Sequence, residues 1–221
     1  MRIYWHSSAP KGPSSYAVLT RRVVPDIVRA GHVVTMGAWY GAEAGPDDWI
    51  IFRDRKNPGL YLHAEGEDGF QKYVQGREQI AGVVRVWPRL AEAGNYGREL
   101  LEPIYRGSES EVLITCVDVW IFPPEVTAFA RFCPWFPIDT APVGQPVVAA
   151  LRGALYPMSF SRFGIAELGK VGIEAHYVPC GAPGDVFAPL DQAEARRILG
   201  VPEGCEFLVA MVAANKDPED R

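Results

Sequence analysis

The chain has 221 residues, of which 48% are hydrophobic, 22% charged and 11% aromatic, the composition of a folded globular protein. Its net charge of -5 argues against a nucleic-acid-binding protein, because phosphate contacts need clustered Lys and Arg. No run approaches the ~20 apolar residues that span a bilayer, and no signal-peptide core follows Met1. We therefore expect a cytoplasmic protein, with peripheral membrane contact left open.

The first elements along the chain follow a strand–helix–strand order. A short apolar strand is expected over 2–5, then a loop rich in small residues. Apolar positions recur at helical spacing over 14–30, with a serine available as the N-cap and Gly31 as the stop. A β-branched strand follows over 32–36. Such a unit implies parallel pairing and places the first loop at the carboxyl edge of the sheet.

Strands and helices continue to alternate through the rest of the first 180 residues. The expected elements are strands over 50–52 and 60–62, helices over 68–79 and 92–105, strands over 111–117 and 126–135, a helix over 145–152, a strand over 155–159, a helix over 162–171 and a strand over 174–178. This alternation predicts an α/β fold, a Rossmann-like, doubly wound and mainly parallel sheet with flanking helices, as one domain over 1–180.

The composition of the chain changes after Pro179. A turn-rich connector over 181–205 contains an expected helix from Asp191 to Leu199, and 207–212 reads as a buried strand. A domain does not normally end after its first strand. We therefore expect 206–221 to be the first strand and loop of a second, truncated domain.

Four cysteines show no CxxC spacing and have no nearby pair of histidines, so no metal site and no disulfide framework are expected. The sequence contains only four histidines in all.

Several short motifs lie in a fixed order in the second half of the chain. They are Phe136-Pro137-Ile138-Asp139, Met158-Ser159-Phe160-Ser161-Arg162-Phe163-Gly164, Val178-Pro179-Cys180-Gly181, Phe187-Ala188-Pro189-Leu190-Asp191 and Glu194-Ala195-Arg196-Arg197-Ile198-Leu199-Gly200, followed by the strand over 207–212. With Gly12 in the first loop, this order resembles the family 4 glycosyltransferases, which have the GT-B architecture of two Rossmann-like domains. Two positions depart from the family pattern: Cys180 stands where the family has Asn or His, and Ala182-Pro183 stands where it has Val-Asp.

The resemblance implies a glycosyltransferase that moves a sugar from a nucleotide-sugar co-substrate to a hydroxyl of a saccharide or other acceptor, with retention and without a required metal or other cofactor. It implies that this chain is mainly the acceptor-binding half and that most donor contacts belong to a C-terminal domain the chain lacks. Lys216 and Arg221 are the candidates here for part of a diphosphate clamp, and two solvated loop charges are the alternative.

Three residues are candidates for catalysis because each follows a strand at the functional edge of the sheet. Asp118 follows the strand over 111–117, and Asp139 lies in a loop bounded by prolines. Either carboxylate could orient an acceptor hydroxyl, and a cap or turn role is the alternative. His6 follows the first strand, and a structural role is the alternative for it as well.

Five further residues are candidates for substrate binding. Lys11 and Gly12 lie in the first loop, where the lysine could meet phosphate and the glycine could allow close backbone approach. Ser14 lies in the same loop, and capping of the following helix is the alternative role for it. Trp120 could stack on a sugar ring, and a place in the hydrophobic core is the alternative. Arg162 at a helix start needs a partner such as a carboxylate or phosphate.

Two other functional classes compete with the transferase. A non-catalytic saccharide-binding or split-subunit module would use the same fold without donor chemistry. A sugar-nucleotide epimerase with the GT-B fold would need acidic and histidine residues for proton transfer, and the scarcity of histidine argues against it.

Overall fold

The computed structural model describes residues 1–42, 46–56, 59–63, 79–90, 93–182, 184 and 187–210. It divides into two units, Met1–Cys180 and Gly181–Arg221, which are described separately.

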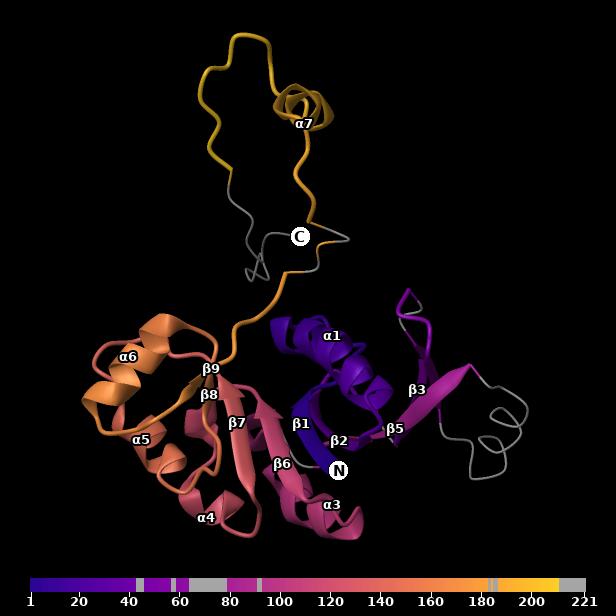
Figure 1. The fold of residues 1–221 in the computed structure, drawn as a ribbon, viewed down its shortest axis with the longest axis vertical. Coiled ribbons are helices and arrows are strands. Elements are labelled where there is room, and N and C mark those ends of the chain that lie inside the picture. Colours follow the sequence, from indigo (N-terminus) through magenta and orange to yellow (C-terminus); the bar gives the residue numbers. More distant parts are fainter. Residues whose placement is uncertain are drawn as a thin grey trace. The chain divides into compact units, whose positions relative to one another are not determined.

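The first unit is an α/β structure built on a mixed, mostly parallel sheet of nine strands within the described residues (Figure 1). The strands are β1 (Arg2–Ser8), β2 (Val33–Tyr40), β3 (Asp47–Phe52), β4 (Leu60–His63), β5 (Ile80–Pro88), β6 (Val112–Cys116), β7 (Phe132–Phe136), β8 (Met158–Ser159) and β9 (His176–Tyr177). Their order across the sheet is β4-β3-β5-β2-β1-β6-β7-β8-β9, and β3 runs antiparallel to both of its neighbours. The Rossmann-like α/β prediction is confirmed at this level, with an antiparallel edge added.

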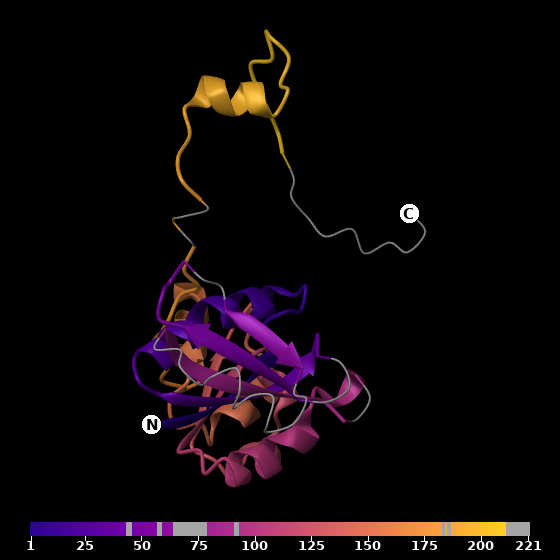
Figure 2. The ribbon, with the colours of Figure 1, turned by 90° about the vertical axis from the view of Figure 1, so that its right-hand side faces the viewer.

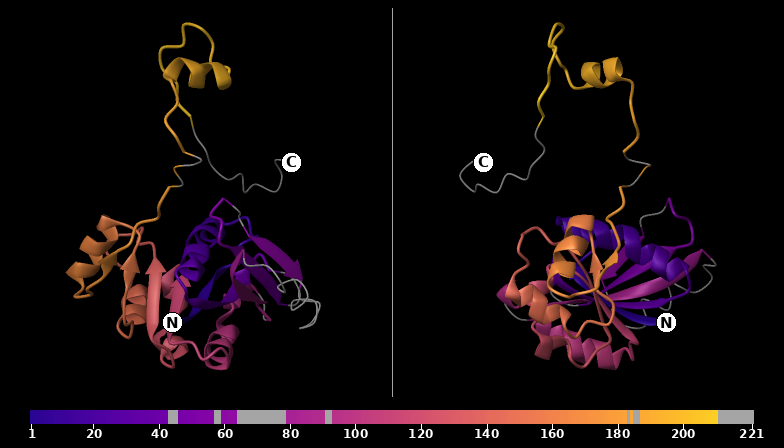
Figure 3. Two further views of the ribbon diagram at one scale, coloured as in Figure 1. Left: turned by 45° about the vertical axis from the view of Figure 1, so that its right-hand side comes forward. Right: turned by 60° about the vertical axis from the view of Figure 1, so that its left-hand side comes forward.

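The helices of this unit lie on both faces of the sheet (Figure 2). They are α1 (Ser15–Arg29), α3 (Leu101–Gly107), α4 (Pro124–Thr127), α5 (Gln145–Leu151) and α6 (Arg162–Lys170), with short 3-10 helices η1 (Ala93–Asn95), η2 (Arg98–Leu100) and η3 (Val119–Ile121). One core cluster forms between the sheet and α1, and a second gathers the buried side chains of α3, η3 and α5 on the opposite face. Figure 3 shows α6, in orange, beside the short strands β8 and β9.

The central strand β1 lies between β2 and β6, and the chain leaves it in opposite directions. Helix α1 carries the chain from β1 to β2 on one side, whereas β6 and β7 extend the sheet on the other. In an open parallel sheet, this reversal opens a crevice at the carboxyl ends of the two diverging strands, where ligands bind. The crevice is therefore expected beside Ser8 and Cys116.

One strand of the structure was not expected, and two expected elements of the first unit differ in kind or extent. The nine-residue strand β5 was not predicted, because Gly82 interrupts its apolar run; a Cβ there would lie 2.7 Å from Val28 Cγ1, so the glycine lets α1 approach the sheet. The strand expected over 126–135 is wrong at its start, since Pro124 begins the short helix α4 and β7 starts only at Phe132.

The helix expected over 92–105 is broken into η1, η2 and α3, because Tyr96 and Gly97 have positive φ angles of 53° and 66°. The helix expected over 68–79 falls almost entirely outside the described residues.

The second unit contains one helix, α7 (Gln192–Ile198), among its described residues. Asp191 caps it, since its Oδ1 accepts a bond from Glu194 N at 3.1 Å. The buried strand expected over 207–212 is wrong for 207–210, which are exposed and form no strand; no other strand is described in this unit to pair with them. The remainder, 211–221, lies outside the described residues.

No described helix is long and apolar enough to cross a membrane. All four cysteines are free.

Candidate functional site

Two of the predicted carboxylates gather around Tyr16 at the carboxyl edge of the sheet. Asp118 follows β6, and its Oδ2 accepts a hydrogen bond of 2.9 Å from the Tyr16 hydroxyl. Burial, then the charge and hydrogen bond of Asp118, and more weakly the charge of Asp139, hold the pKa of Tyr16 well above its usual range. The hydroxyl therefore stays protonated and donates. Asp118 is only half-buried, so part of its side chain is exposed at this edge of the sheet.

Tyr16 is a site residue that the sequence pattern did not single out. It occupies the second position of α1, directly after the loop that follows β1. A helix that begins at the carboxyl edge of a sheet points its first-turn side chains into the crevice, and this placement is the signal that would have found it.

Trp120 belongs to a row of aromatic rings on the face opposite α1. Its ring meets Tyr96 edge-on at 6.0 Å between centroids, and Tyr96 in turn lies 5.4 Å from Trp39. Trp120 is 50% exposed and Tyr40, next in the row, is 41% exposed. Half-exposed aromatic rings offer apolar faces to a ring-bearing ligand. Trp120 thus lies within a larger aromatic surface, which we define as Trp39, Tyr40, Tyr96 and Trp120.

His6 lies beneath this surface and does not reach solvent. It is fully buried, its Nε2 lies 2.9 Å from the Tyr96 carbonyl oxygen, and its ring meets Phe122 edge-on. Burial lowers the pKa of His6 to about 4, so the ring is neutral. Since a carbonyl only accepts, Nε2 carries the proton, and Nδ1 accepts from the Tyr4 hydroxyl at 3.3 Å. We therefore assign His6 a structural role in place of the expected catalytic one.

The first loop is held by internal contacts. Lys11 Nζ forms an ion pair of 2.6 Å with Asp47, a carboxylate that is almost completely buried. Ser14 caps α1 by accepting a hydrogen bond from Ala17 N at 3.1 Å. The Lys11 charge is thus already partnered, and Ser14 Oγ is used as a cap.

Gly12 serves close packing between two loops. Its N–H donates to the Ala9 carbonyl oxygen at 2.9 Å, and Gly41, at φ +77°, lies against it so closely that a Cβ on Gly41 would be 2.7 Å from Gly12 Cα. The glycine pair therefore explains the small residues here without a bound phosphate.

Gly41→Ala should cost about 2 kcal/mol of unfolding free energy, because it adds left-handed strain and a backbone clash. Gly31→Ala is the matched control: φ is +88° but no atom lies within 4 Å of its Cβ position, so only the strain of about 1 kcal/mol is expected. Urea denaturation measures both. Equal losses would contradict the loop contact.

Arg162 begins α6, which Ser161 caps through Gly164 N at 3.0 Å. Its guanidinium lies over the Tyr177 ring, 5.0 Å from the centroid, so an aromatic face is the partner found at this helix start. Lys216 and Arg221 lie outside the described residues.

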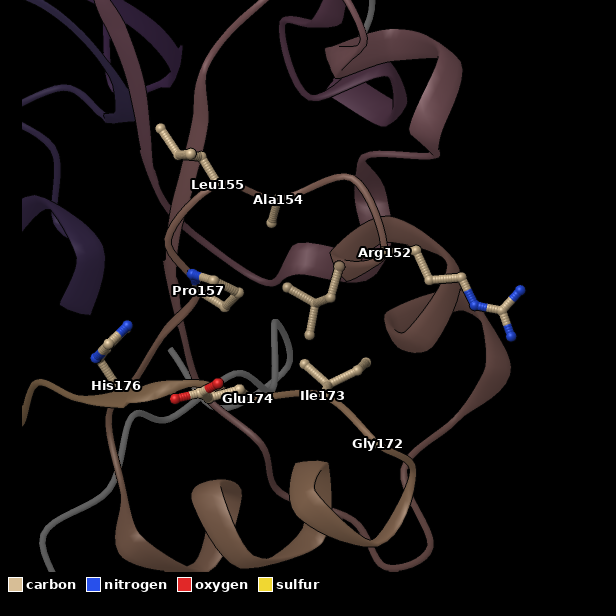
Figure 4. A pocket seen from close by; sticks show the side chains of 9 residues that line it. Arg152, Ala154, Leu155, Pro157, Gly172, Ile173, Glu174 and His176 are labelled. Carbon is tan, nitrogen blue, oxygen red and sulfur yellow. The ribbon is translucent and has the colours of Figure 1, made fainter.

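A pocket of about 440 Å³ opens at the opposite, amino edge of β8 and β9, between the segments that precede these strands (Figure 4). Leu155, Pro157 and Ile173 contribute apolar side chains, and Arg152 and His176 lie on different sides of it (Figure 4). None of the predicted site residues lines this pocket.

Within the described ranges, no three His, Cys, Asp or Glu side chains come together as a metal site. No model of a known protein family matches the chain, and a search of curated proteins also gives no match.

Proposed function

We propose that this protein binds the hydroxyl-bearing acceptor of a glycosyltransferase reaction whose donor is a nucleotide sugar. The observation that carries the proposal is the half-buried Asp118 carboxylate at the carboxyl ends of β1 and β6. Tyr16 holds this carboxylate, and the exposed Trp120 ring is two residues away in the chain. A carboxylate orients and deprotonates a hydroxyl, and an aromatic face receives the apolar side of a sugar ring.

The proposed role of Asp118 is to accept a hydrogen bond from the acceptor hydroxyl. Tyr16 occupies Oδ2, while no hydrogen bond is made to Oδ1 by any described residue. The resemblance to family 4 glycosyltransferases assigns the leaving diphosphate to a second domain, with Lys216 and Arg221 as its proposed contacts in this chain. Asp139, which is exposed just beyond the end of β7, is a second candidate contact for the acceptor.

The test measures saccharide binding to the chain by saturation-transfer NMR with a panel of neutral and anionic sugars. Asp118→Asn should weaken sugar binding by roughly tenfold or more, because it removes a charge-assisted hydrogen bond. Tyr16→Phe should have a smaller effect, since it keeps the charge and removes only the bond that orients it.

Glu125→Gln, an exposed carboxylate on α4, serves as the matched control and should leave affinity unchanged. Tight binding of nucleotide sugars with no acceptor binding would contradict the assignment of this unit to the acceptor.

A saccharide-binding module without transfer is the second candidate. It is favoured because the Asp118 carboxylate and the exposed Trp120 ring could bind a sugar without any donor contact. Incubation with nucleotide sugars and bound acceptors separates the two, because only the transferase yields a glycosylated product, with the donor domain supplied in cis or as a partner.

A further inference from the structure

Three enclosed N–H donors come from three segments of the first unit: the end of β2, the residue after β5, and η2. They are the indole Nε1 of Trp39, Nη1 of Arg89 and Nε of Arg98. Each atom is buried, and no hydrogen-bond acceptor reaches it from the described residues. Buried donors are normally paired, and an unpaired one costs about 1–3 kcal/mol.

The segment after β5 is tied to both of the others. Arg89 N donates to the Ala38 carbonyl oxygen at 3.0 Å, directly beside Trp39 in the chain. Leu90 N donates to Glu99 Oε1 at 2.8 Å, and Glu99 is the neighbour of Arg98. Arg89 is therefore bonded directly to the end of β2 through Ala38. Arg98 lies next to Glu99, which is bonded to Leu90, the residue after Arg89.

The segment carrying Arg98 also packs on the end of β2. A Cβ on Gly97 would lie 3.1 Å from His6 Cε1 and 3.3 Å from Trp39 Cβ, and its φ of +66° also favours glycine, so this position suits a residue without a side chain. Tyr96, one residue earlier, places its ring 5.4 Å from the Trp39 ring. All three unpaired donors thus come from segments that contact one another.

The chemistry of these atoms indicates the ligand. All three are donors, and both guanidinium groups carry a positive charge and no acceptor. Arginine presents its N–H groups in a planar fork that matches the oxygens of phosphate and carboxylate. An oxyanion supplies the missing acceptors, and its negative charge is attracted by both guanidinium groups.

The surroundings suit a ligand that also carries a ring. Both arginines are half-buried, so solvent reaches part of each side chain. Trp87, which is 39% exposed near the end of β5, and the aromatic surface defined above lie at the same strand ends.

We propose that Arg89, Arg98 and the Trp39 indole form a binding site for the oxyanion group of a ring-bearing ligand, a phosphate or carboxylate attached to a sugar. That this ligand is the acceptor rests on the proposed function. That the site binds an anion does not depend on the proposed function. The aromatic surface then receives the ring while the arginines hold its charged substituent.

Calorimetry on the full chain tests the site with three probes of one size class: glucose 6-phosphate, glucuronate and glucose. We expect at least one anionic sugar to bind roughly tenfold or more tightly than glucose, and its identity decides between phosphate and carboxylate. Arg89→Gln and Arg98→Gln should each weaken binding of that sugar roughly tenfold, and added salt should weaken it further.

Arg152→Gln is the matched control, an exposed arginine at the opposite edge of the sheet, and should leave the affinity unchanged. Thermal unfolding checks that each variant is folded; where a glutamine variant is not, Arg89→Lys or Arg98→Lys replaces it, because lysine keeps the charge and loses the fork. Loss of affinity in these variants supports the site.

The proposal is overturned if neither anionic sugar binds more tightly than glucose, or if Arg152→Gln loses as much affinity as the other two. Anion binding without any transfer would keep this site and remove the transferase function. Transfer to neutral acceptors without anion binding would support the transferase function and overturn the anion site.

Discussion

Gly37→Ala is expected to destabilise the protein by about 3 kcal/mol, because the core leaves no room for the added methyl group. Gly37 is a buried residue in β2, and a Cβ there would lie 2.1 Å from the Tyr4 hydroxyl oxygen and 3.0 Å from His6 Nδ1. Neither neighbour can move away cheaply, because Tyr4 and His6 are both fully buried. Urea denaturation gives the loss as a lower transition midpoint.

A double-mutant cycle identifies the cause. Tyr4→Phe removes the oxygen that the new methyl group meets, so Gly37→Ala should cost at least about 1 kcal/mol less in the Tyr4→Phe background. Gly169→Ala is the control: it lies in α6 with no atom within 4 Å of its Cβ position, and is expected to be neutral or stabilising by up to about 1 kcal/mol. Strict additivity in the cycle would rule out the Tyr4 contact as the cause.

The free energy of unfolding should fall by about 3 kcal/mol as the pH drops from 6.5 to 4, through His6 alone. Burial lowers the pKa of the folded His6 to about 4, whereas in the unfolded chain it has its ordinary value of 6.5. Between these values the unfolded state binds the extra proton, so stability is complete above pH 6.5 and is lost toward pH 4. Each pH unit of the interval is worth about 1.4 kcal/mol.

His6→Gln tests this prediction, because the glutamine amide keeps an N–H for the Tyr96 carbonyl oxygen and does not titrate. Denaturation curves at pH 7, 5.5 and 4.5 should show a shallower decline in the variant than in the unchanged protein. His176→Gln, at an exposed position, should retain the original decline. An unchanged slope in His6→Gln would show that another group causes the acid loss.

These two predictions concern one buried set that lies under the aromatic surface. Tyr4 donates to His6, and His6 donates to the backbone of Tyr96, which holds a positive φ of 53°. The hydrogen bond fixes a backbone conformation that is costly for a residue other than glycine. Damage to this set should therefore disturb ligand binding as well as stability.

The sequence located part of the candidate site because strand ends can be read from it. Asp118 was found as the polar residue after a clean apolar strand, and in a parallel sheet that position meets the ligand crevice. Tyr16, Arg89 and Arg98 were not found, because each acquires its place in a site only when segments distant in the chain come together. Tyr16 meets Asp118 and Arg89 meets Ala38 in this way, and hydrophobic periodicity does not encode such pairings.

The sequence by itself determined the α/β class, the strand–helix–strand unit that opens the chain and most helix starts, since these depend on local hydrophobic period and on caps such as Ser14 and Ser161. Tertiary structure alone decided that His6 is a neutral core residue, that Lys11 is paired with Asp47, and that β5 joins β2 inside the sheet. The physical reason is that burial and charge pairing arise between segments distant in the chain, and their free energies depend on which side chains the folded sheet brings together.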